Sequence, residues 1–307
     1  MYHTTFDNNQ WLEKFKAASA KKAGFRELRQ EIFEQTVQIV NSGGYVLNGK
    51  EIAIDKTEIA RNTEFFDTDF PLREVERLRE TKVSVIEADC LEVAELLGKA
   101  GFDPCVLNMA NRQNPGGGVA SGAGAQEENV FRRSNLFASL YQFSGSSARY
   151  GVARSERQYT LDRNHGGIYS KGVTVFRSSE NSGYALLETP FQTSVVSVAA
   201  INNPPLTRIG GQLRIADDLI EPAKARMRTI LRIAGKHGHD ALVLGAAGCG
   251  AFCNPPEHVA MLFKEVFAEP QFRSRFALIV FAIINDHNSR RSHNPNGNYD
   301  PFRKVFG

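Results

Sequence analysis

Six short apolar runs in the later part of the chain limit the folds that this sequence can adopt. They read VSVIEA, CVLNMA, VTVF, SVVSVAA, ALVLGAA and FALIVFAII, and they begin at residues 83, 105, 173, 194, 241 and 276. Continuous apolar runs of this length, rich in β-branched residues, are typical of strands that are buried on both faces. The sequence therefore predicts a central sheet that is covered on both sides.

Helical stretches fall between these runs. Residues 92–101 and 259–267 place apolar residues on one face of a helix: Val93, Leu96 and Leu97 in the first, and Val259, Leu262, Phe263 and Val266 in the second. Strands that alternate with helices predict a three-layer α/β/α domain around a mixed central sheet. Ligands of such domains bind in the loops beyond the carboxyl ends of the strands.

The N-terminal part of the chain has a different pattern of apolar residues. Phe25, Leu28, Ile32 and Ile39 recur at helical spacing before Ser42, Gly43 and Gly44 interrupt the pattern. Residues 57–80 show no clear period, and no chemical motif occurs in this region. We expect residues 1–80 to form an N-terminal helical extension and residues 81–307 to form the domain that carries the chemistry.

Composition and charge limit the kinds of ligand that the protein is expected to bind. A net charge of +3 and a pI near 8.6 fall short of the dense basic field of a DNA-track binder and suit a small anionic ligand. We expect no membrane span and an intracellular protein, because there is no long apolar run and the opening residues do not resemble a secretion signal. We expect the pairs Lys21-Lys22, Arg132-Arg133 and Arg290-Arg291 to be solvated, and the four cysteines to be reduced thiols.

Two glycine-rich loops follow two of the predicted strands. Gly116–Gly118 come after CVLNMA, and Gly248-Cys249-Gly250 come after ALVLGAA. Glycine brings backbone N–H groups close to an anion, so two such loops predict a bound diphosphate, with plain turns as the alternative. We expect Asn254 to cap the following helix and Pro255 to be its first residue. Neither loop matches the phosphate loop of kinases or the dinucleotide fingerprint.

A run of acidic residues follows the first loop. Residues 125–141 are predicted to form one helix, with Gln126, Glu127 and Glu128 in or next to its first turn. Adjacent helical residues project about 100° apart, so one glutamate is expected to be catalytic and the other supporting. The alternative is that both glutamates complement the helix dipole and that Glu128 pairs with Arg132 at i+4.

The segment that joins these features resembles a known family. The run from Val106 to Glu128, VLNMANRQNPGGGVASGAGAQEE, is similar to the signature of the microbial-type poly(ADP-ribose) glycohydrolases, which are macrodomains with a Gly-Gly-Gly, spacer, Gln-Glu-Glu motif. Residues 167–177 and 243–260 also resemble segments of this family, and the resemblance extends from about residue 80 onward. It implies a macrodomain fold, hydrolysis of O-glycosidic ribose–ribose bonds in poly(ADP-ribose), and no cofactor.

The same resemblance implies roles for individual residues. Glu128 would be the catalytic glutamate, and Glu127 would hold the ADP-ribose unit on the scissile side. Asn111 and Phe252 would contact the distal ribose, and Asp89 would lie on the adenine side, although its neighbours depart from the usual Gly-Asp-Ile-Thr. The remaining ligand-binding residues that the resemblance implies are Gln126 and the two diphosphate loops, Gly116, Gly117, Gly118, Val119 and Gly248, Cys249, Gly250, Ala251, Phe252.

The implied mechanism uses one carboxyl group twice. Glu128 would protonate the leaving ribose oxygen as general acid and then deprotonate the attacking water. A helix N-terminus favours the ionised carboxylate, whereas a bound diphosphate favours the protonated acid that this role requires. The expected partners are ADP-ribose, poly(ADP-ribose) and ADP-ribosylated proteins.

Two other functions fit a macrodomain. One is hydrolysis of oxygen-linked mono-ADP-ribose on protein or nucleic acid, and the other is ADP-ribose binding by a non-catalytic reader. The adjacent charges of Glu127 and Glu128 argue against the reader, because they add nothing to the binding of a diphosphate. We expect no metal site, since the histidines pair only in His237-Gly238-His239, and Cys249 and Cys253 lack a second ligand pair. We also expect Cys249 to be a small residue rather than a nucleophile, and Trp11 to be buried.

Overall fold

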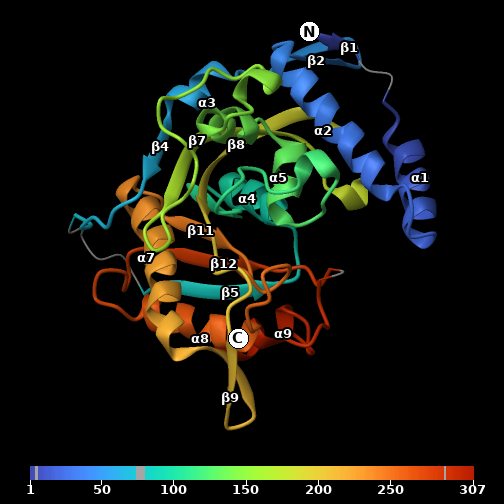
Figure 1. Ribbon diagram of the computed structural model, residues 1–307. Helices are drawn as coiled ribbons and strands as arrows, with labels where there is room; N and C mark the ends of the chain where they lie inside the picture. The colour runs from blue at the N-terminus through green and yellow to red at the C-terminus, as the bar shows by residue number, and fades with distance from the viewer. Residues whose placement is uncertain (4–5, 74–79, 287) are drawn as a thin grey trace. The chain divides into compact units, whose positions relative to one another are not determined.

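The computed structural model describes residues 1–3, 6–73, 80–286 and 288–307, which form two compact units. The first unit comprises residues 1–64, 113–160 and 170–193, and the second comprises residues 65–112, 161–169 and 194–307. Figure 1 shows the elements in chain order. The proposed division of the chain at residue 80 stays a prediction.

The first unit contains most of the short helices and a small sheet. Its helices are α1 (Asn8–Ala20), α2 (Phe25–Asn41), α3 (Thr57–Arg61), α5 (Gln126–Arg133) and α6 (Leu136–Leu140), with 3-10 turns η1 (Val119–Ser121), η2 (Tyr141–Phe143), η3 (Ser147–Tyr150) and η4 (Glu180–Ser182). Strands β1 (Tyr2–His3), β2 (Gly44–Leu47) and β3 (Lys50–Ala53) form a three-stranded sheet.

The helix that was predicted from Phe25 is confirmed as α2. Its apolar stripe is buried at Ile32 and Ile39, and the helix ends at Asn41. Trp11 is buried as well, because its ring stacks on Phe15 at 4.8 Å and its indole N–H donates to the carbonyl of Leu28 at 3.2 Å. These contacts join α1 to α2.

The second unit contains the larger core and the remaining helices. Its helices are α4 (Cys90–Lys99), α7 (Ile220–Lys236), α8 (Pro256–Phe267) and α9 (Tyr299–Phe306), with the 3-10 turn η5 (Asp217–Leu219), and its strands are β5 (Lys82–Ile86), β6 (Pro104–Met109), β9 (Leu206–Ile209), β10 (Gln212–Ile215), β11 (Ala241–Leu244) and β12 (Leu278–Ala282). Strands β4 (Thr63–Phe66), β7 (Gly167–Arg177) and β8 (Leu186–Val198) contain residues of both units. All six predicted strands are confirmed.

The main sheet is mixed and has seven strands in the order β4-β7-β8-β6-β11-β12-β5. The pairs β8–β6, β6–β11, β11–β12 and β12–β5 are all parallel. Parallel strands end at the same edge of a sheet, so the segments that follow β6, β8 and β11 leave from one edge. Strands β9 and β10 form a separate antiparallel hairpin.

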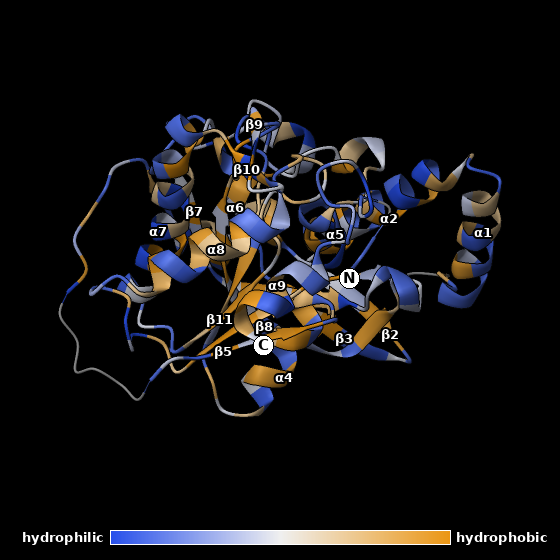
Figure 2. Cartoon of the chain, turned by 90° about the horizontal axis from the view of Figure 1, so that it is seen from below, coloured by the Kyte–Doolittle hydropathy of each residue, from blue (hydrophilic) through white to orange (hydrophobic). Residues whose placement is uncertain are grey.

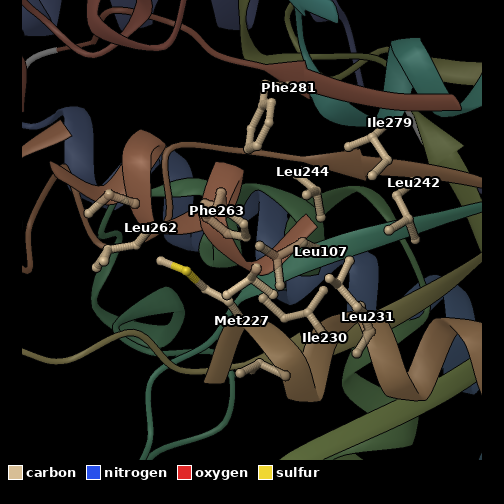
Figure 3. Packing of buried hydrophobic residues seen from close by; sticks show 14 of the residues in the cluster. Leu107, Met227, Ile230, Leu231, Leu242, Leu244, Leu262, Phe263, Ile279 and Phe281 are labelled. Atoms are coloured by element: carbon tan, nitrogen blue, oxygen red, sulfur yellow. The ribbon is translucent and has the colours of Figure 1, made fainter. Parts of the chain in front are cut away.

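One face of the parallel strands builds the core of the second unit. Alternate residues such as Leu242, Leu244, Ile279 and Phe281 pack against α7 and α8, as Figure 3 shows. Residues on the opposite face, such as Val243, are buried as well, and α4 packs against β6 and β11. The strands are largely hydrophobic (Figure 2), as expected for a sheet covered on both faces.

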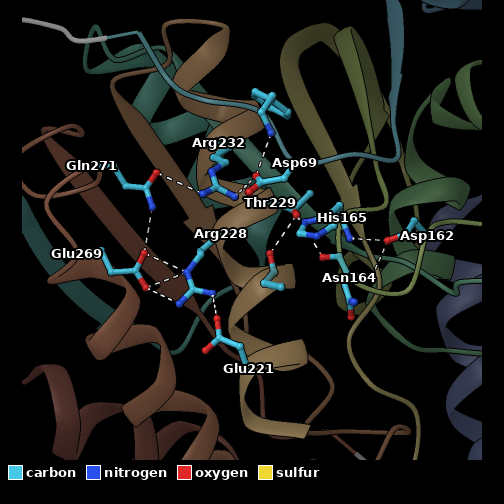
Figure 4. Close-up of polar contacts among 12 residues, drawn as sticks. Asp69, Asp162, Asn164, His165, Glu221, Arg228, Thr229, Arg232, Glu269 and Gln271 are labelled. Carbon is cyan, nitrogen blue, oxygen red and sulfur yellow. Dashed lines mark hydrogen bonds and ion pairs between the residues drawn. The ribbon is translucent and has the colours of Figure 1, made fainter.

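Polar contacts fix α7 at its outer surface, as Figure 4 shows. Arg228 pairs with Glu269 at 2.8 Å and also with Glu221, and Arg232 pairs with Asp69. The carboxylates of these pairs are partly exposed, so their contribution to stability is small beside that of the core. Among the described residues, none of the helices combines the length and the apolar character that crossing a membrane requires.

Candidate active site

The glycine loop of the first unit holds the two candidate carboxylates. The Gly116 N–H donates to Glu127 Oε1 at 3.0 Å, and the Gly118 N–H donates to Glu128 Oε1 at 2.9 Å. Both glutamates lie in the first turn of α5 and are buried, with exposed fractions of 3% and 7%. The glycine-rich segment that precedes the carboxylates therefore wraps around them, and its backbone N–H groups donate to both.

Glycine is required in this loop for reasons of space. A Cβ on Gly117 would lie 2.5 Å from Glu128 Oε1, and a Cβ on Gly116 would lie 2.5 Å from a ring carbon of Phe131. Both glycines also have positive φ, +54° and +75°, which side chains rarely adopt. Any larger residue would displace the carboxylates or the loop.

The other two N–H groups of the loop also have partners inside the protein. Gly117 donates to the carbonyl of Asn114, and Val119 donates to the carbonyl of Gly116. All four N–H groups from Gly116 to Val119 are thus engaged within the first unit. The diphosphate contact expected of these residues stays a prediction, and with this loop conformation it would have to use other atoms.

The two oxygens of Glu128 have different environments. Oε1 accepts from Gly118, whereas Oε2 is buried and has no hydrogen-bond partner among the described residues. A buried carboxylate oxygen without a partner is costly and therefore uncommon. One oxygen of Glu128 is fixed by the protein, and the other is left for a ligand atom.

The arginines that follow the glutamates are buried, so the expectation that Arg132-Arg133 is solvated was wrong. Their exposed fractions are 0% and 2%. Arg132 donates from Nε to the Tyr184 hydroxyl at 2.8 Å and from NH1 to the carbonyl of Ala123 at 2.8 Å. The alternative ion pair between Glu128 and Arg132 is not formed within the described residues. Arg132 is buried because α5 is packed among α2, η1 and α6.

The single helix predicted over residues 125–141 is also wrong, because it is two short helices with a break at Ser134 and Asn135. Ser134 is extended, with φ −145° and ψ 174°, and forms an isolated bridge with Val175. The Asn135 side chain accepts from the Thr174 N–H and donates to the carbonyl of Asp55, at 2.8 Å in each case. These tertiary contacts replace the next helical turn.

The charge of Glu127 also acts on a tyrosine that the sequence did not single out. Burial, and after it the negative charge of Glu127, raises the pKa of Tyr159 well above its ordinary value. The phenol therefore stays neutral. Tyr159 lies 32 residues after Glu127 in a segment without regular structure, so no periodic pattern marked it.

The second glycine loop, in the other unit, is organised by one asparagine. Asn254 Nδ2 donates to the carbonyls of Ile201, Gly248 and Phe252 at 2.7, 3.1 and 3.0 Å. The expected cap by Asn254 is therefore wrong, because its amide is used inside the loop. Helix α8 instead begins at Pro256, with Pro255 as its N-cap residue.

This loop differs from the first in how its backbone N–H groups are used. The N–H groups of Gly250, Ala251 and Phe252 have no acceptor in the part of the chain that the structure describes. Three successive N–H groups next to the N-terminus of a twelve-residue helix can form an anion-binding nest. The second loop, more than the first, has the donors that a phosphate requires.

The remaining predicted site residues have the following positions. Cys249 is buried between glycines, and burial raises the pKa of its thiol, so the nucleophilic thiolate is disfavoured. Asp89 caps α4 by accepting from the Leu91 and Glu92 N–H groups at 2.9 and 3.1 Å. Asn111 is half-buried just after β6. The ligand roles of these residues stay predictions.

The described ranges hold no group of three or more His, Cys, Asp or Glu side chains placed to bind a metal ion.

Comparisons with known proteins agree with this architecture. Residues 33–178 match the family model described as microbial-type PARG, catalytic domain. The structure of poly(ADP-ribose) glycohydrolase from Thermomonospora curvata is similar, with 32% identity, a TM-score of 0.70, and coverage of 91% of this chain and 99% of that chain.

Two further structures were solved with ligands. One is the Thermomonospora curvata protein bound to the inhibitor ADP-HPD, with 32% identity, a TM-score of 0.69 and the same coverage. The other is the Deinococcus radiodurans glycohydrolase in complex with ADP-ribose, with 26% identity, a TM-score of 0.61, and coverage of 85% of this chain and 97% of that chain. A comparison with curated proteins gave no match. The chain belongs to the microbial-type poly(ADP-ribose) glycohydrolase catalytic-domain family.

Proposed function

We propose that this protein hydrolyses the O-glycosidic ribose–ribose bonds of poly(ADP-ribose), releasing ADP-ribose, with Glu128 as general acid and base. The observation that carries the proposal is the state of the Glu128 carboxylate. Its Oε1 is held by Gly118, and its buried Oε2 has no partner among the described residues. An oriented carboxyl group with one oxygen left for a ligand is the arrangement that proton transfer requires.

The proposed reaction has two proton transfers. Protonated Glu128 gives its proton to the ribose oxygen as the bond between that oxygen and the anomeric carbon breaks, which leaves an oxocarbenium-like centre. The resulting carboxylate takes a proton from the water that attacks this carbon. Glu128 returns to its protonated form, and the products are ADP-ribose and a shortened polymer.

Glu127 has a supporting part in this proposal. Its Oε1 accepts from Gly116 and the residue is 3% exposed, so the loop positions it as firmly as it positions Glu128. The two carboxylates are neighbours on one helical turn rather than opposed across a substrate, so the two-carboxylate arrangement of most glycosidases does not apply. We assign Glu127 to holding the ribose on the scissile side, together with Gln126.

We further propose that the N–H groups of Gly250, Ala251 and Phe252 bind phosphate oxygens of the ligand. Their lack of acceptors among the described residues supports this role. The relatives solved with ADP-ribose and with ADP-HPD support the ligand class. Asn111 and the Phe252 ring are proposed to contact the distal ribose, and Asp89 the adenine side.

The decisive experiment compares wild type with Glu128→Gln on auto-modified poly(ADP-ribosyl)ated protein. Free ADP-ribose and residual mono-modification are measured separately. We expect wild type to release ADP-ribose, and the variant to lose activity by about 10²-fold or more while still binding ADP-ribose. The amide still offers an oxygen to the Gly118 N–H, so the loop is preserved in this variant.

The other outcomes identify the alternatives. Removal of single oxygen-linked ADP-ribose without cleavage of polymer would indicate a mono-ADP-ribosyl hydrolase. Binding without release by wild type would indicate a reader. A Glu128→Gln variant within about tenfold of wild type would exclude Glu128 as the acid, because acid–base catalysis contributes more than that.

A further inference from the structure

The carbonyl of Cys249, in the second glycine loop, is held by two side chains from the segment that follows β12. His293 Nε2 lies 2.8 Å from this oxygen, and Asn294 Nδ2 donates to it at 3.0 Å. A carbonyl oxygen can only accept, so His293 carries a proton on Nε2 and donates it. The three residues belong to the second unit and are buried, with exposed fractions of 0%, 5% and 0%. Two buried donors therefore converge on this one oxygen.

This contact fixes the direction of one N–H group of the loop. The Cys249 carbonyl and the Gly250 N–H belong to one peptide plane, and in a trans peptide they point in opposite directions. Because the carbonyl points at His293 and Asn294, the Gly250 N–H points away from them, and it has no acceptor among the described residues. A turn of this peptide would take the acceptor from buried His293, which is costly.

The neighbouring peptide is oriented within the loop itself. The Gly250 carbonyl accepts from the Cys253 N–H at 3.2 Å, so the turn from Gly250 to Cys253 sets the direction of the Ala251 N–H. The peptide that carries the Gly250 N–H is instead oriented by residues that lie 44 and 45 positions after Cys249. The direction of this donor therefore depends on a distant segment.

That segment is closed on itself around Asn294. Asn294 Oδ1 accepts from the Arg291 N–H at 2.8 Å, and the Asn294 carbonyl accepts from the Gly297 N–H at 2.9 Å. Asn294 Nδ2 also donates to the carbonyl of Asn288 at 2.9 Å. Asn288 in turn lies beside the loop, because a Cβ on Gly250 would be 3.4 Å from the Asn288 Cβ. The amide of Asn294 is thus held in place before it reaches the Cys249 carbonyl.

We propose that His293 and Asn294 are positioning residues for phosphate binding: by holding the Cys249 carbonyl, they aim the Gly250 N–H at a phosphate oxygen of the ligand. This inference rests on the proposed function, which assigns the phosphate to this loop. It gives a role to the polar segment between β12 and α9, in which the sequence indicated no site residue.

The first test compares His293→Leu with His293→Gln. Leucine cannot donate, whereas glutamine can place an amide N–H near the position of Nε2. We expect the Kd for ADP-ribose, measured by calorimetric titration, to rise about tenfold in His293→Leu and to stay close to wild type in His293→Gln.

His239→Leu is the matched control for the loss of a buried histidine. His239 is also 5% exposed and lies in the same unit, where its Nε2 is 2.8 Å from the Tyr169 hydroxyl. It precedes β11, whereas the loop follows this strand. His239→Leu should therefore lower the thermal stability without changing the Kd.

NMR spectra of the amide groups separate positioning from a general loss of structure. The Gly250 amide signal should move when ADP-ribose is added to wild type or to His293→Gln, and should move much less in folded His293→Leu. A purely structural role would lower the melting temperature and leave this movement unchanged.

A second pair of variants tests Asn294. In Asn294→Asp, Oδ1 can still accept from Arg291, but a carboxylate oxygen replaces the amide that donates to the Cys249 carbonyl. Asn298→Asp adds the same charge nearby and keeps the oxygen that accepts from Asn294 Nδ2 at 2.8 Å. We expect Asn294→Asp to raise the Kd for ADP-ribose by about tenfold or more, and Asn298→Asp to raise it less.

The inference would be overturned by a folded His293→Leu variant that binds ADP-ribose as tightly as wild type and shows the same movement of the Gly250 signal. If that variant does not fold, equal affinity of Asn294→Asp and Asn298→Asp would overturn it instead. A wild type that binds ADP-ribose but releases none from polymer would reject the proposed hydrolysis alone, and the affinities would still decide the role of His293 and Asn294. A wild type that binds no ADP-ribose would overturn both.

Discussion

At the scale of single residues, the site depends on how backbone donors are distributed. The first glycine loop gives its N–H groups to the two carboxylates, to Asn114 and to its own turn. The second loop keeps three N–H groups without acceptors among the described residues. One loop therefore orients the Glu127 and Glu128 carboxylates, and we assign the other to the phosphate. At Gly116 and Gly117 of the first loop and at Gly248 of the second, a side chain would occupy the space of a neighbouring group.

Gly117→Ala should impair catalysis more than stability. The new Cβ would lie 2.5 Å from Glu128 Oε1, so the carboxylate must move. Displacement by about 1 Å can reduce the rate by about 10²-fold, so we expect a loss of that order in kcat. Gly98→Ala is the matched control, since a Cβ there meets no atom within 4 Å, and it should leave kcat unchanged. Equal activity of the two variants would contradict the assigned geometry.

Ala251→Pro should weaken ADP-ribose binding. Proline removes one of the three N–H groups that lack an acceptor among the described residues. A hydrogen bond to a charged group contributes about 1.5 to 3 kcal/mol, so Kd should rise by at least about tenfold. Ala251→Ser keeps the N–H at this exposed position and should bind like wild type. Calorimetric titration with ADP-ribose measures both, and thermal unfolding checks that the proline variant is folded. Unchanged affinity in a folded proline variant would exclude the Ala251 N–H as a phosphate donor.

At the scale of elements, short helices and turns are fixed by side chains from distant segments. Helix α5 ends at Arg133 because Asn135 is bonded to residues 55 and 174. Helix α8 is joined to the β9–β10 hairpin through His258, whose Nδ1 accepts from the Ile215 N–H at 2.9 Å. That bond requires a neutral imidazole, because protonated Nδ1 has no lone pair to accept with.

His258 should therefore make the protein less stable as the pH falls. Burial, and after it the charge of Arg214, lowers the pKa of His258 to about 4. An unfolded histidine titrates near 6.5, so the unfolded state binds more protons between about 4 and 6.5 and stability decreases through this range as pH falls. We expect the denaturation midpoint to drop more steeply from about pH 6.5 to about pH 4.5 in wild type than in His258→Gln. Parallel pH curves would contradict a buried neutral His258.

At the scale of the whole molecule, residues from distant parts of the sequence share each compact unit. In the first unit, Phe33 of α2 packs its ring near Phe131, Phe137 and Tyr141, with centroid distances of 6.2 to 6.4 Å. The Thr36 hydroxyl donates to the carbonyl of Arg132 at 2.6 Å. Helix α2 therefore forms part of the core that surrounds the candidate catalytic helix.

A chain of residues 81–307 tests the proposed division at residue 80. Without α2, the rings of Phe131 and Phe137 and the buried Arg132 and Arg133 would lose a covering layer, and burying charge without its partners is costly. We expect this shorter chain to lack a single cooperative unfolding transition and to lose ADP-ribose binding, as followed by near-ultraviolet circular dichroism and calorimetry. Cooperative unfolding with intact binding would instead show that residues 1–80 are a dispensable extension.

The sequence alone was sufficient for the fold class, the six strands, helices α2, α4 and α8, and the family. Strands that are buried on both faces appear in the sequence as continuous apolar runs, and amphipathic helices appear as a regular spacing of apolar residues. Both can therefore be recognised from the local sequence. The Gly-Gly-Gly and Gln-Glu-Glu triplets likewise lie within one short stretch, residues 116–128. These features depend on neighbours within a few residues of one another.

Only the tertiary structure decided which polar groups are buried and what they contact. Arg29 donates to Glu180 at 2.7 Å although the two are 151 residues apart in sequence, and no pattern near either residue indicates the other. Arg132-Arg133 has the composition of a surface pair, yet it is buried because distant helices and turns cover α5. Hydrogen-bond partners and burial depend on the approach of distant segments in space, which local sequence does not record.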